Sequence, residues 1–554
     1  MARLKGPEGL VAEVVEYKPT ATLEALDRLE KLRRRRSAQA KIGGLGDLEQ
    51  PELLGLALDD LGKDEDGDGS TNPFRADVVD RATATHYALT GRLDAPGDAV
   101  LTPVPTALPP RKAEINAAIR ALRRDPRVGA AIRRGDLVAS PAMPGAIVTS
   151  GPRRRRPRRA ITIGLIGQKH PDGGAYRIVD VDPLDGTVLG THDRAAHADC
   201  GSPDDGDPSD TSTGGMVKVT VQQGDKTLWE LVVIRPNAIA ANNGVGLSIR
   251  QVFFKGRRVL HRADTPIVNV KYDTQNESGA TSYRDWLNEE AGFRATGTDV
   301  IPGYRLCRRP PKTLFDEDRA GHSRAGGNFE GVSFHWDGTT LVATTLLAAG
   351  WYRYRVEWRL GADGTITPTF GFAAVVNPNT CSPHTHHSYW RLDFDIDTAG
   401  NNAVKRRIGS LASHFTVGDP KTLARRLKEM VELEWQAVHF ERRMVRTLFS
   451  AWQVLNADSG YGYAVYPSVR DGQADSGFGV GDVWALRYHA GEDVDANPGA
   501  GDQAHLDPYV NREKLDRADV VLWYAGHARH DQHEDDLHDV HGHVVGPELA
   551  PVKW

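Results

Sequence analysis

The chain has 554 residues, 40% of them hydrophobic and 26% charged, which is typical of a globular protein with several domains. The net charge of −5 is small for this length, so we expect no nucleic-acid partner. No stretch approaches the roughly 18 apolar residues of a membrane span, and residues 1–30 lack the apolar run of a secretory signal. Three cysteines, at 200, 307 and 381, are too few for a disulfide framework. We therefore expect a cytoplasmic protein without a membrane partner.

Residues 1–110 combine a charged helical pattern with short apolar runs. Between Thr22 and Arg36, leucines recur at helical spacing, at positions 23, 26, 29 and 32. Residues 86–110 indicate two strands and then a proline-rich exit. We therefore expect a small α+β domain over residues 1–110.

Residues 111–200 are expected to form a second small α+β domain, because a pair of helices that packs on an antiparallel sheet forms such a unit. The patterns predict two helices followed by three strands, over Arg111–Arg124, Val128–Arg134, Ala160–Gly167, Tyr176–Asp182 and Gly186–Gly190.

A linker and a long β-rich region complete the chain. Residues 201–215 are rich in Gly, Asp, Ser and Pro, which is typical of a linker. Over residues 216–554, short apolar and aromatic runs such as Lys218–Gln222 and Leu228–Ile234 alternate with turn residues. This pattern predicts a large antiparallel β-sandwich. Lys421–Ala437 is the exception, because its Leu, Met and Val residues recur at helical spacing and predict a helix.

The segment Cys381–Asp397 contains a His-x-His pair around which we organise the functional interpretation. Its aromatic and β-branched residues predict a strand. Residues i and i+2 of a strand point to the same face, so His384 and His386 lie side by side and His387 faces the other way. Two such imidazoles are a ready pair of metal ligands, although two half-buried histidines on an ordinary strand fit the same pattern.

Three segments of the β-rich region resemble the copper-containing amine oxidases. In that family the His-x-His pair is followed by Arg-Leu-Asp, and Arg391-Leu392-Asp393 stands at the same distance from His384. Residues 481–488, GDVWALRY, look like a further family strand. Residues 517–523, RADVVLW, are similar to the family's Asp-Ile-Val-Val-Trp strand. From there the match continues to Asp535, Asp536, Gly546, Leu549 and Pro551.

The resemblance implies that His384, His386 and His530 bind one copper ion, because the family's third ligand follows the Trp of that strand by seven residues. Three histidines and a water would also suit a catalytic zinc, and ligand type alone does not separate the two metals. The His-rich tail from His527 to His543 leaves a metal-scavenging tail as another interpretation. The continuous match around Trp523 favours His530.

The resemblance also implies a quinone cofactor, topaquinone, formed from a tyrosine of the chain. The matching position is Tyr352, because Trp358 and Asp363-Gly364 follow it at the family's spacings. Its neighbours depart from the family, since Trp351 replaces an Asn and Arg353 replaces an acid. The alternative is a core tyrosine on an alternating strand.

A general base is needed to remove a proton from the carbon next to the amine, and a carboxylate in a desolvated pocket suits this task because burial raises its pKa. The resemblance implies Asp285 as this base, Tyr283 as a gate and Tyr272 as the partner of the quinone oxygen. The adjacent acids Glu289 and Glu290 are an alternative source of the base, and a solvated acidic loop is the structural alternative.

A second, non-catalytic cation site of the family uses carboxylates beside the copper strands. Asp393 and Asp395 match it on one strand and Asp519 on another. Residues 393 and 395 share a face of a strand, so calcium or another hard cation is expected to bridge them to Asp519.

Taken together, the resemblance implies a copper-dependent oxidase that converts a primary amine and O2 into an aldehyde, ammonia and hydrogen peroxide. It implies small α+β N-terminal domains, the first of them divergent, followed by a large all-β antiparallel sandwich. The family forms homodimers, so we expect a homodimer that acts on a small-molecule substrate. The alternative is a copper oxidase of the same fold that lacks topaquinone and acts on a different, biosynthetic substrate. A non-enzymatic metal-binding relative is a third interpretation.

Overall fold

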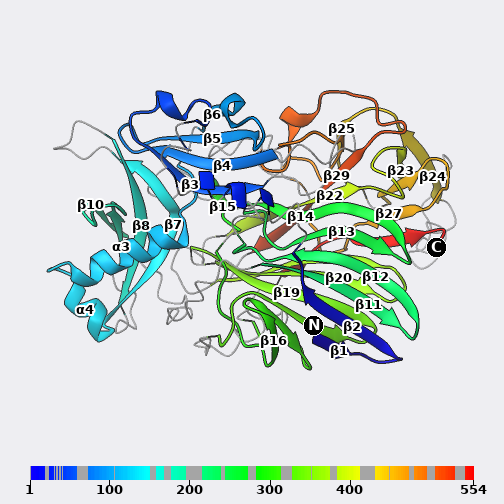
Figure 1. The fold of residues 1–554 in the computed structure, drawn as a ribbon, viewed down its shortest axis with the longest axis horizontal. Helices are drawn as coiled ribbons and strands as arrows, with labels where there is room; N and C mark the ends of the chain where they lie inside the picture. Colours follow the sequence, from blue (N-terminus) through cyan, green and yellow to red (C-terminus); the bar gives the residue numbers. More distant parts are fainter. Residues whose placement is uncertain are drawn as a thin grey trace, which may run out of the picture.

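Two large β-sheets dominate the computed structural model of the chain (Figure 1). The residues that it describes are 2–18, parts of 24–39, 41–58, 73–104, 107–149, 157–167, 176–194, 215–238, 244–272, 282–287, 289–313, 327–350, 352–374, 383–411, 431–447, 449–472, 474, 480–495, 506–530 and 543–554.

The first large sheet has eleven strands and contains the His-x-His strand, β22. Its order is β1-β2-β11-β12-β13-β14-β22-β29-β28-β25, with β15 added beside β14. The strands are β1 (Ala2–Lys5), β2 (Leu10–Glu16), β11 (Met216–Gln223), β12 (Lys226–Ile234), β13 (Ser248–Phe254), β14 (Arg257–Tyr272), β15 (Ser282–Asp285), β22 (His384–Phe394), β25 (Arg442–Met444), β28 (Val483–Arg487) and β29 (Val520–His530).

The second large sheet has twelve strands in the order β16-β17-β18-β19-β20-β21-β31-β27-β26-β23-β24, with β30 beside β21. β17 and β18 run parallel, whereas the other pairs along this order are antiparallel. The strands are β16 (Gly297–Ile301), β17 (Tyr304–Cys307), β18 (Val332–Asp337), β19 (Thr340–Ala349), β20 (Tyr352–Gly361), β21 (Ile366–Ala374), β23 (Asn402–Leu411), β24 (Val431–Val438), β26 (Ala451–Asn456), β27 (Gly462–Tyr466), β30 (His543–Val545) and β31 (Glu548–Val552).

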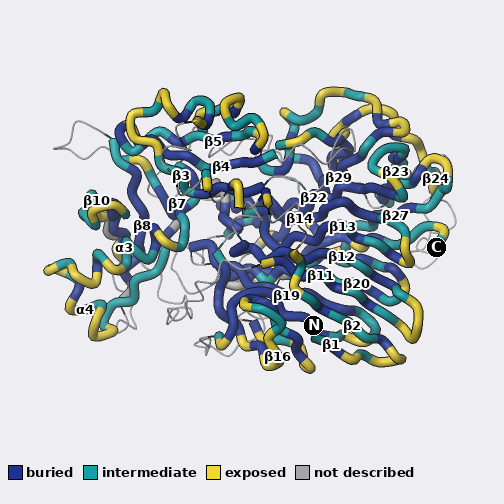
Figure 2. Tube along the Cα trace, in the orientation of Figure 1, coloured by how far each residue is buried: buried dark blue, intermediate teal, exposed yellow. Residues whose placement is uncertain are grey.

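The two sheets pack face to face around one core to which both contribute, as the alternating apolar runs predict. Buried tryptophans join them, because the indole N–H of Trp229 donates to the carbonyl of Gly361 at 2.8 Å. Trp358 on β20 donates in the opposite direction, to the carbonyl of Leu247, also at 2.8 Å. Figure 2 shows the interior strands of the sandwich buried along most of their length. The large antiparallel sandwich is therefore confirmed.

Two four-stranded sheets lie beside the sandwich (Figure 1). The first is β3 (Pro51–Leu58), β4 (Pro73–Asp80), β5 (Thr85–Arg92) and β6 (Val100–Val104); the second, in the order β10-β9-β8-β7, is β7 (Leu137–Thr149), β8 (Arg158–Gly167), β9 (Tyr176–Val181) and β10 (Val188–Arg194). The helices α3 (Lys112–Arg124) and α4 (Gly129–Arg134) precede the second sheet. α3 packs on it through Ile115, Ala118 and Leu122, and Ile132 of α4 is partly buried against the same cluster.

The N-terminal strands β1 and β2 belong to the eleven-stranded sheet and not to the first small sheet. Residues 1–110 are expected to form one domain, but β2 pairs with β11 along Leu10–Glu16 and extends the eleven-stranded sheet. Leu10, Ala12 and Val14, every second residue of β2 up to Val14, are buried in the sandwich core. The predicted linker lies outside the described residues except for Gly215.

The predicted helix Lys421–Ala437 is wrong over its second half. Residues 431–438 form β24, an edge strand that pairs with β23 from Leu411↔Val431 to Val404↔Val438. Val431, Leu433, Trp435 and Ala437 also alternate with polar residues, so the same segment carries a strand period, and hydrogen bonding to β23 favours it. Residues 421–430 lie outside the described range. Among the described residues, no helix is long and apolar enough to cross a membrane.

Candidate functional site

Strand register brings the predicted site residues to one face of the eleven-stranded sheet. Tyr272 pairs with His384 between β14 and β22, and His384 pairs with His530 between β22 and β29. On the other side of β14, Val268 pairs with Asp285 and Val270 pairs with Tyr283. Residues directly opposite each other in an antiparallel pair share a face, and so do residues two apart on one strand. Positions 272, 283, 285, 384, 386 and 530 therefore all belong to this face.

The register also separates the histidines near the C-terminus. His527 pairs with His387, so it lies on the opposite face of the sheet from positions 384, 386 and 530. The Nδ1 atoms of His527 and His387 are 2.7 Å apart, and His527 Nε2 lies 3.2 Å from Asp482 Oδ1. His527 therefore belongs to a buried polar cluster with His387 and Asp482, on the face of the sheet opposite the predicted copper site. His533, His538 and His541 lie outside the described residues.

Tyr352 comes to the histidine face from the second sheet. It is the first residue of β20 and is fully buried. Its hydroxyl lies 2.9 Å from His384 Nε2 and 2.8 Å from the Tyr272 hydroxyl. The ring of His386 meets the Tyr352 ring edge-on, with centroids 4.7 Å apart. The tyrosine predicted as the quinone precursor therefore lies directly against His384 and His386, two of the three residues predicted to bind copper.

Asp285 is buried beside a tyrosine that the sequence analysis overlooked. Its Oδ2 accepts a hydrogen bond from the hydroxyl of Tyr354, two residues after Tyr352 on β20. Burial raises the pKa of Asp285 to about 8, and the Tyr354 hydrogen bond opposes part of that rise. Burial also raises the pKa of Tyr354 well above its ordinary value, so Tyr354 remains the donor. Tyr354 was detectable from sequence, because residue i+2 shares the face of Tyr352.

A cavity of about 120 Å³ reaches Asp285 from the side of the small sheets. Arg75 and Asp77 of β4 line one wall, Arg111 lies at the start of α3, and Trp286 and Asp495 belong to the sandwich domain. Asp285 Oδ1 is buried and has no hydrogen-bond partner. The cavity thus brings the buried Asp285 together with charged groups of both signs on its walls.

Two neighbours of Tyr352, Trp351 and Arg353, differ from the residues expected from the resemblance, and the structure describes one of them. Arg353 points away from the Tyr352 ring, because its guanidinium donates to the carbonyls of Gly350 at 3.2 Å and Tyr352 at 3.0 Å. Those contacts hold the backbone at the start of β20. Trp351 lies outside the described residues.

The alternative acids Glu289 and Glu290 are occupied by structural contacts. Glu290 is fully buried and paired with Arg235, whose Nε lies 3.0 Å from Glu290 Oε1. Glu289 lies 3.7 Å from Lys112 of α3. Unlike these two residues, Asp285 accepts a hydrogen bond from a tyrosine beside the histidines, so the geometry favours Asp285 as the candidate base.

The three carboxylates predicted to hold a second cation lie together. Each of Asp393, Asp395 and Asp519 offers an oxygen within 4.8 Å of the others. Asp393 and Asp395 are buried, and Arg391 and Arg258 lie 3.4 and 3.3 Å from their respective Oδ2 atoms. By residue parity, positions 393 and 395 lie on the opposite side of the β22 chain from His384 and His386.

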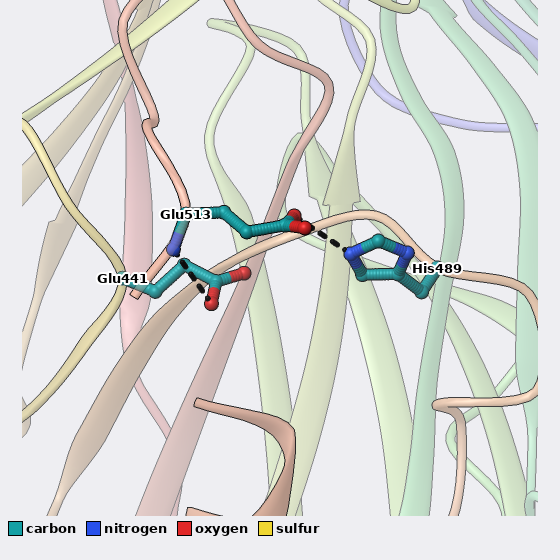
Figure 3. Close-up of side chains that lie close together, drawn as sticks. All are labelled: Glu441, His489 and Glu513. Atoms are coloured by element: carbon teal, nitrogen blue, oxygen red, sulfur yellow. Dashed lines mark hydrogen bonds and ion pairs between the residues drawn. The ribbon is translucent and has the colours of Figure 1, made fainter. Parts of the chain in front are cut away.

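A further cluster, unforeseen from the sequence, contains Glu441, His489 and Glu513 (Figure 3). His489 Nε2 lies 2.8 Å from Glu513 Oε2. Glu441 accepts hydrogen bonds from the backbone N–H groups of Arg487, Asn511 and Glu513. These contacts satisfy the groups without an ion, so we assign the cluster a structural role in joining its three segments.

Comparison with known proteins identifies the fold. By sequence, no family model and no curated protein matches the chain. By structure, it is similar to a copper-containing benzylamine oxidase from Hansenula polymorpha, with a TM-score of 0.60 and 14% identity over 97% of this chain and 98% of that one. It is also similar to an Aspergillus nidulans amine oxidase, with a TM-score of 0.53 and 15% identity over 99% of this chain and 89% of that one. For the Pichia pastoris lysyl oxidase PPLO, the TM-score is 0.51 and the identity is 12% over 98% of this chain and 91% of that one. The chain therefore has the copper amine oxidase fold over nearly its whole length.

Proposed function

We propose that this chain, which has the fold of the copper-containing amine oxidases, is a copper-dependent oxidase of primary amines. One amine, one O2 and one water would give one aldehyde, one ammonia and one hydrogen peroxide. The observation that carries the proposal is the contact of the buried Tyr352 hydroxyl with His384 and Tyr272. Packing alone does not require a tyrosine at this position, because a phenylalanine would fill the same space. The hydroxyl is buried and needs hydrogen-bond partners, and His384 and Tyr272 supply them.

The donor set fits copper. His384 and His386 are buried imidazoles on one strand, and His530 is directly opposite His384 in the register. Imidazole nitrogen is a preferred ligand of copper, although zinc accepts it as well. In this proposal His384, His386 and His530 hold the ion, and copper with a quinone derived from Tyr352 supplies the redox chemistry when bound.

The remaining residues hold and move protons. Asp285 in its deprotonated form accepts the proton from the carbon next to the amine, and burial, which raises its pKa to about 8, makes that form a stronger base than an exposed carboxylate. Tyr272 holds the oxygen of residue 352 by a hydrogen bond. Tyr283, opposite Val270 on β15, is proposed as the gate. Trp286 and Leu287 exclude water from one side of the cavity.

A copper oxidase without topaquinone is a second candidate, and a specific observation favours it. Arg353 fixes the carbonyl of Tyr352 itself, and His384 and Tyr272 hold the hydroxyl at the other end of the same residue. The two hydrogen bonds of the hydroxyl would have to break before the ring could leave this position, which favours a tyrosine that stays unmodified. The two candidates therefore differ in the fate of Tyr352.

Two further features belong to the proposal. We propose that Asp393, Asp395 and Asp519 bind calcium or another hard cation, because their carboxylate oxygens converge within ligand distance of one point and Arg391 and Arg258 offset only part of their mutual repulsion. We also propose a homodimer formed through the β domain, by analogy with the fold's other members.

The experiment that tests the metal site measures copper per chain in single His→Ala variants. We expect His384→Ala, His386→Ala and His530→Ala to lose most of the bound copper and all amine-dependent hydrogen peroxide. His439 is the matched control, because it is exposed and paired with Asp516 away from the site. Full copper in His530→Ala together with loss in His533→Ala would show that the third ligand is misassigned.

A further inference from the structure

The strand β20 carries two tyrosines on one face. Tyr352 and Tyr354 are both fully buried, and their rings stack with centroids 5.8 Å apart at an interplanar angle of 15°. Each hydroxyl lies near a different histidine, because Tyr352 reaches His384 at 2.9 Å and Tyr354 reaches His386 Nδ1 at 3.4 Å. The function proposed above uses the first tyrosine and leaves the second without a role.

The hydroxyl of Tyr354 donates a hydrogen bond to Asp285 Oδ2. This bond makes the two oxygens of one carboxylate different. Oδ2 is held by a donor, whereas Oδ1 is buried without a hydrogen-bond partner in a residue that lines the cavity. A carboxylate with one oxygen fixed cannot rotate freely, so the oxygen available to a substrate in the cavity is Oδ1.

We propose that Tyr354 is a positioning residue for Asp285: its hydroxyl fixes Oδ2 so that Oδ1 accepts the proton of the substrate carbon. The inference rests on the proposed amine oxidase function, in which Asp285 is the base. The substrate C–H bond breaks, the electron pair stays with the substrate and its bound cofactor, and the proton goes to Oδ1. Tyr354 keeps its own proton throughout.

The same hydrogen bond has an electrostatic consequence. A donor to a carboxylate favours its charged form, so the Tyr354 hydroxyl lowers a pKa that burial raises to about 8. Removing the hydroxyl leaves burial unopposed and raises the pKa of Asp285 further. Among the residues whose side chains the structure describes, the titratable or charged groups around Asp285 and Tyr354 are Tyr352 on β20, Tyr272 on β14, His386 on β22, and, around the cavity, Arg75, Asp77, Arg111 and Asp495.

The test compares Tyr354→Phe with Tyr463→Phe. Both tyrosines are buried and donate one hydrogen bond, but Tyr463 donates to the carbonyl of Gly364, away from Asp285. The first readout needs no cofactor: infrared titration of the protonated carboxyl band of copper-free protein, assigned through its loss in Asp285→Asn. We expect the midpoint to rise by about one pH unit or more in Tyr354→Phe and to stay unchanged in Tyr463→Phe.

The second readout is the pH dependence of kcat/KM in the copper-loaded enzyme. In Tyr354→Phe the acid limb should move up by the same amount, which lowers kcat/KM about tenfold at pH 7 and restores much of it at high pH. Amine oxidation by the wild-type protein with neither midpoint moved in Tyr354→Phe overturns the inference and leaves the function standing. No amine oxidation by copper-loaded wild-type protein in air overturns the function, and the positioning role falls with it even if the infrared midpoint moves.

Discussion

Replacing Asp285 by Asn should change how the stability of the protein depends on pH. The pKa of Asp285 is about 8 in the folded protein and close to 3.8 in the unfolded chain. Between these values the folded state retains a proton that the unfolded state has lost, so folding stability falls as pH rises. Each pH unit in this window costs about 1.4 kcal/mol, so wild-type protein should lose about 2.7 kcal/mol relative to Asp285→Asn between pH 5 and pH 7.

The assay is urea unfolding of copper-free wild-type protein and Asp285→Asn at pH 5, 6 and 7, followed by tryptophan fluorescence. Asn has nearly the same shape and does not titrate, so subtracting the two curves removes the contribution of every other group. The difference in unfolding free energy should shift steadily in favour of the variant from pH 5 to pH 7. If the difference in unfolding free energy between wild type and Asp285→Asn is the same at all three pH values, burial does not raise the pKa of Asp285, and the reasoning is refuted.

Three other predictions concern the surroundings of the site. Arg235→Met should destabilise the protein by about 3–5 kcal/mol in urea unfolding, because it leaves Glu290 as a buried charge without its guanidinium partner. Asp395→Asn should weaken calcium binding about tenfold or more in calorimetry. Asp397→Asn is its control, since Asp397 pairs with Arg257 outside the carboxylate cluster, and equal affinities would argue against the second site. Light scattering at micromolar concentration should give twice the monomer mass, and a monomer would contradict the proposed dimer.

Local periodicity was sufficient for the features that depend on a single strand. It places His384 and His386 on one face and indicates the alternating strands of the sandwich. The resemblance supplied the distant partners His530, Tyr272, Asp285 and Tyr352, and the register then put these positions on facing surfaces. No single-strand period contains such information, because pairing between residues 384 and 530 depends on the whole sheet.

Other features depended on contacts that a local pattern does not reveal. Residues 431–437 carry both a helical and a strand period, and hydrogen bonding to β23 decides between them. The hairpin of β1 and β2 joins a strand about two hundred residues away, at Met216–Gln223. The role of Tyr354 became visible only when its hydroxyl was found on Asp285, although its position two residues after Tyr352 was a usable signal.

The central claim is that Tyr352 is oxidised beside copper, and one labelling measurement tests it most directly. Copper-free protein is incubated with Cu(II) and O2, treated with phenylhydrazine and digested with trypsin. Cleavage after Arg324 and Arg353 yields a peptide in which Tyr352 is the only tyrosine, because Tyr354 falls in the following peptide. The account predicts a hydrazine adduct on Tyr352 that is absent in His384→Ala, whereas an unmodified Tyr352 in fully copper-loaded, aerated protein would contradict it and leave the quinone-free copper oxidase.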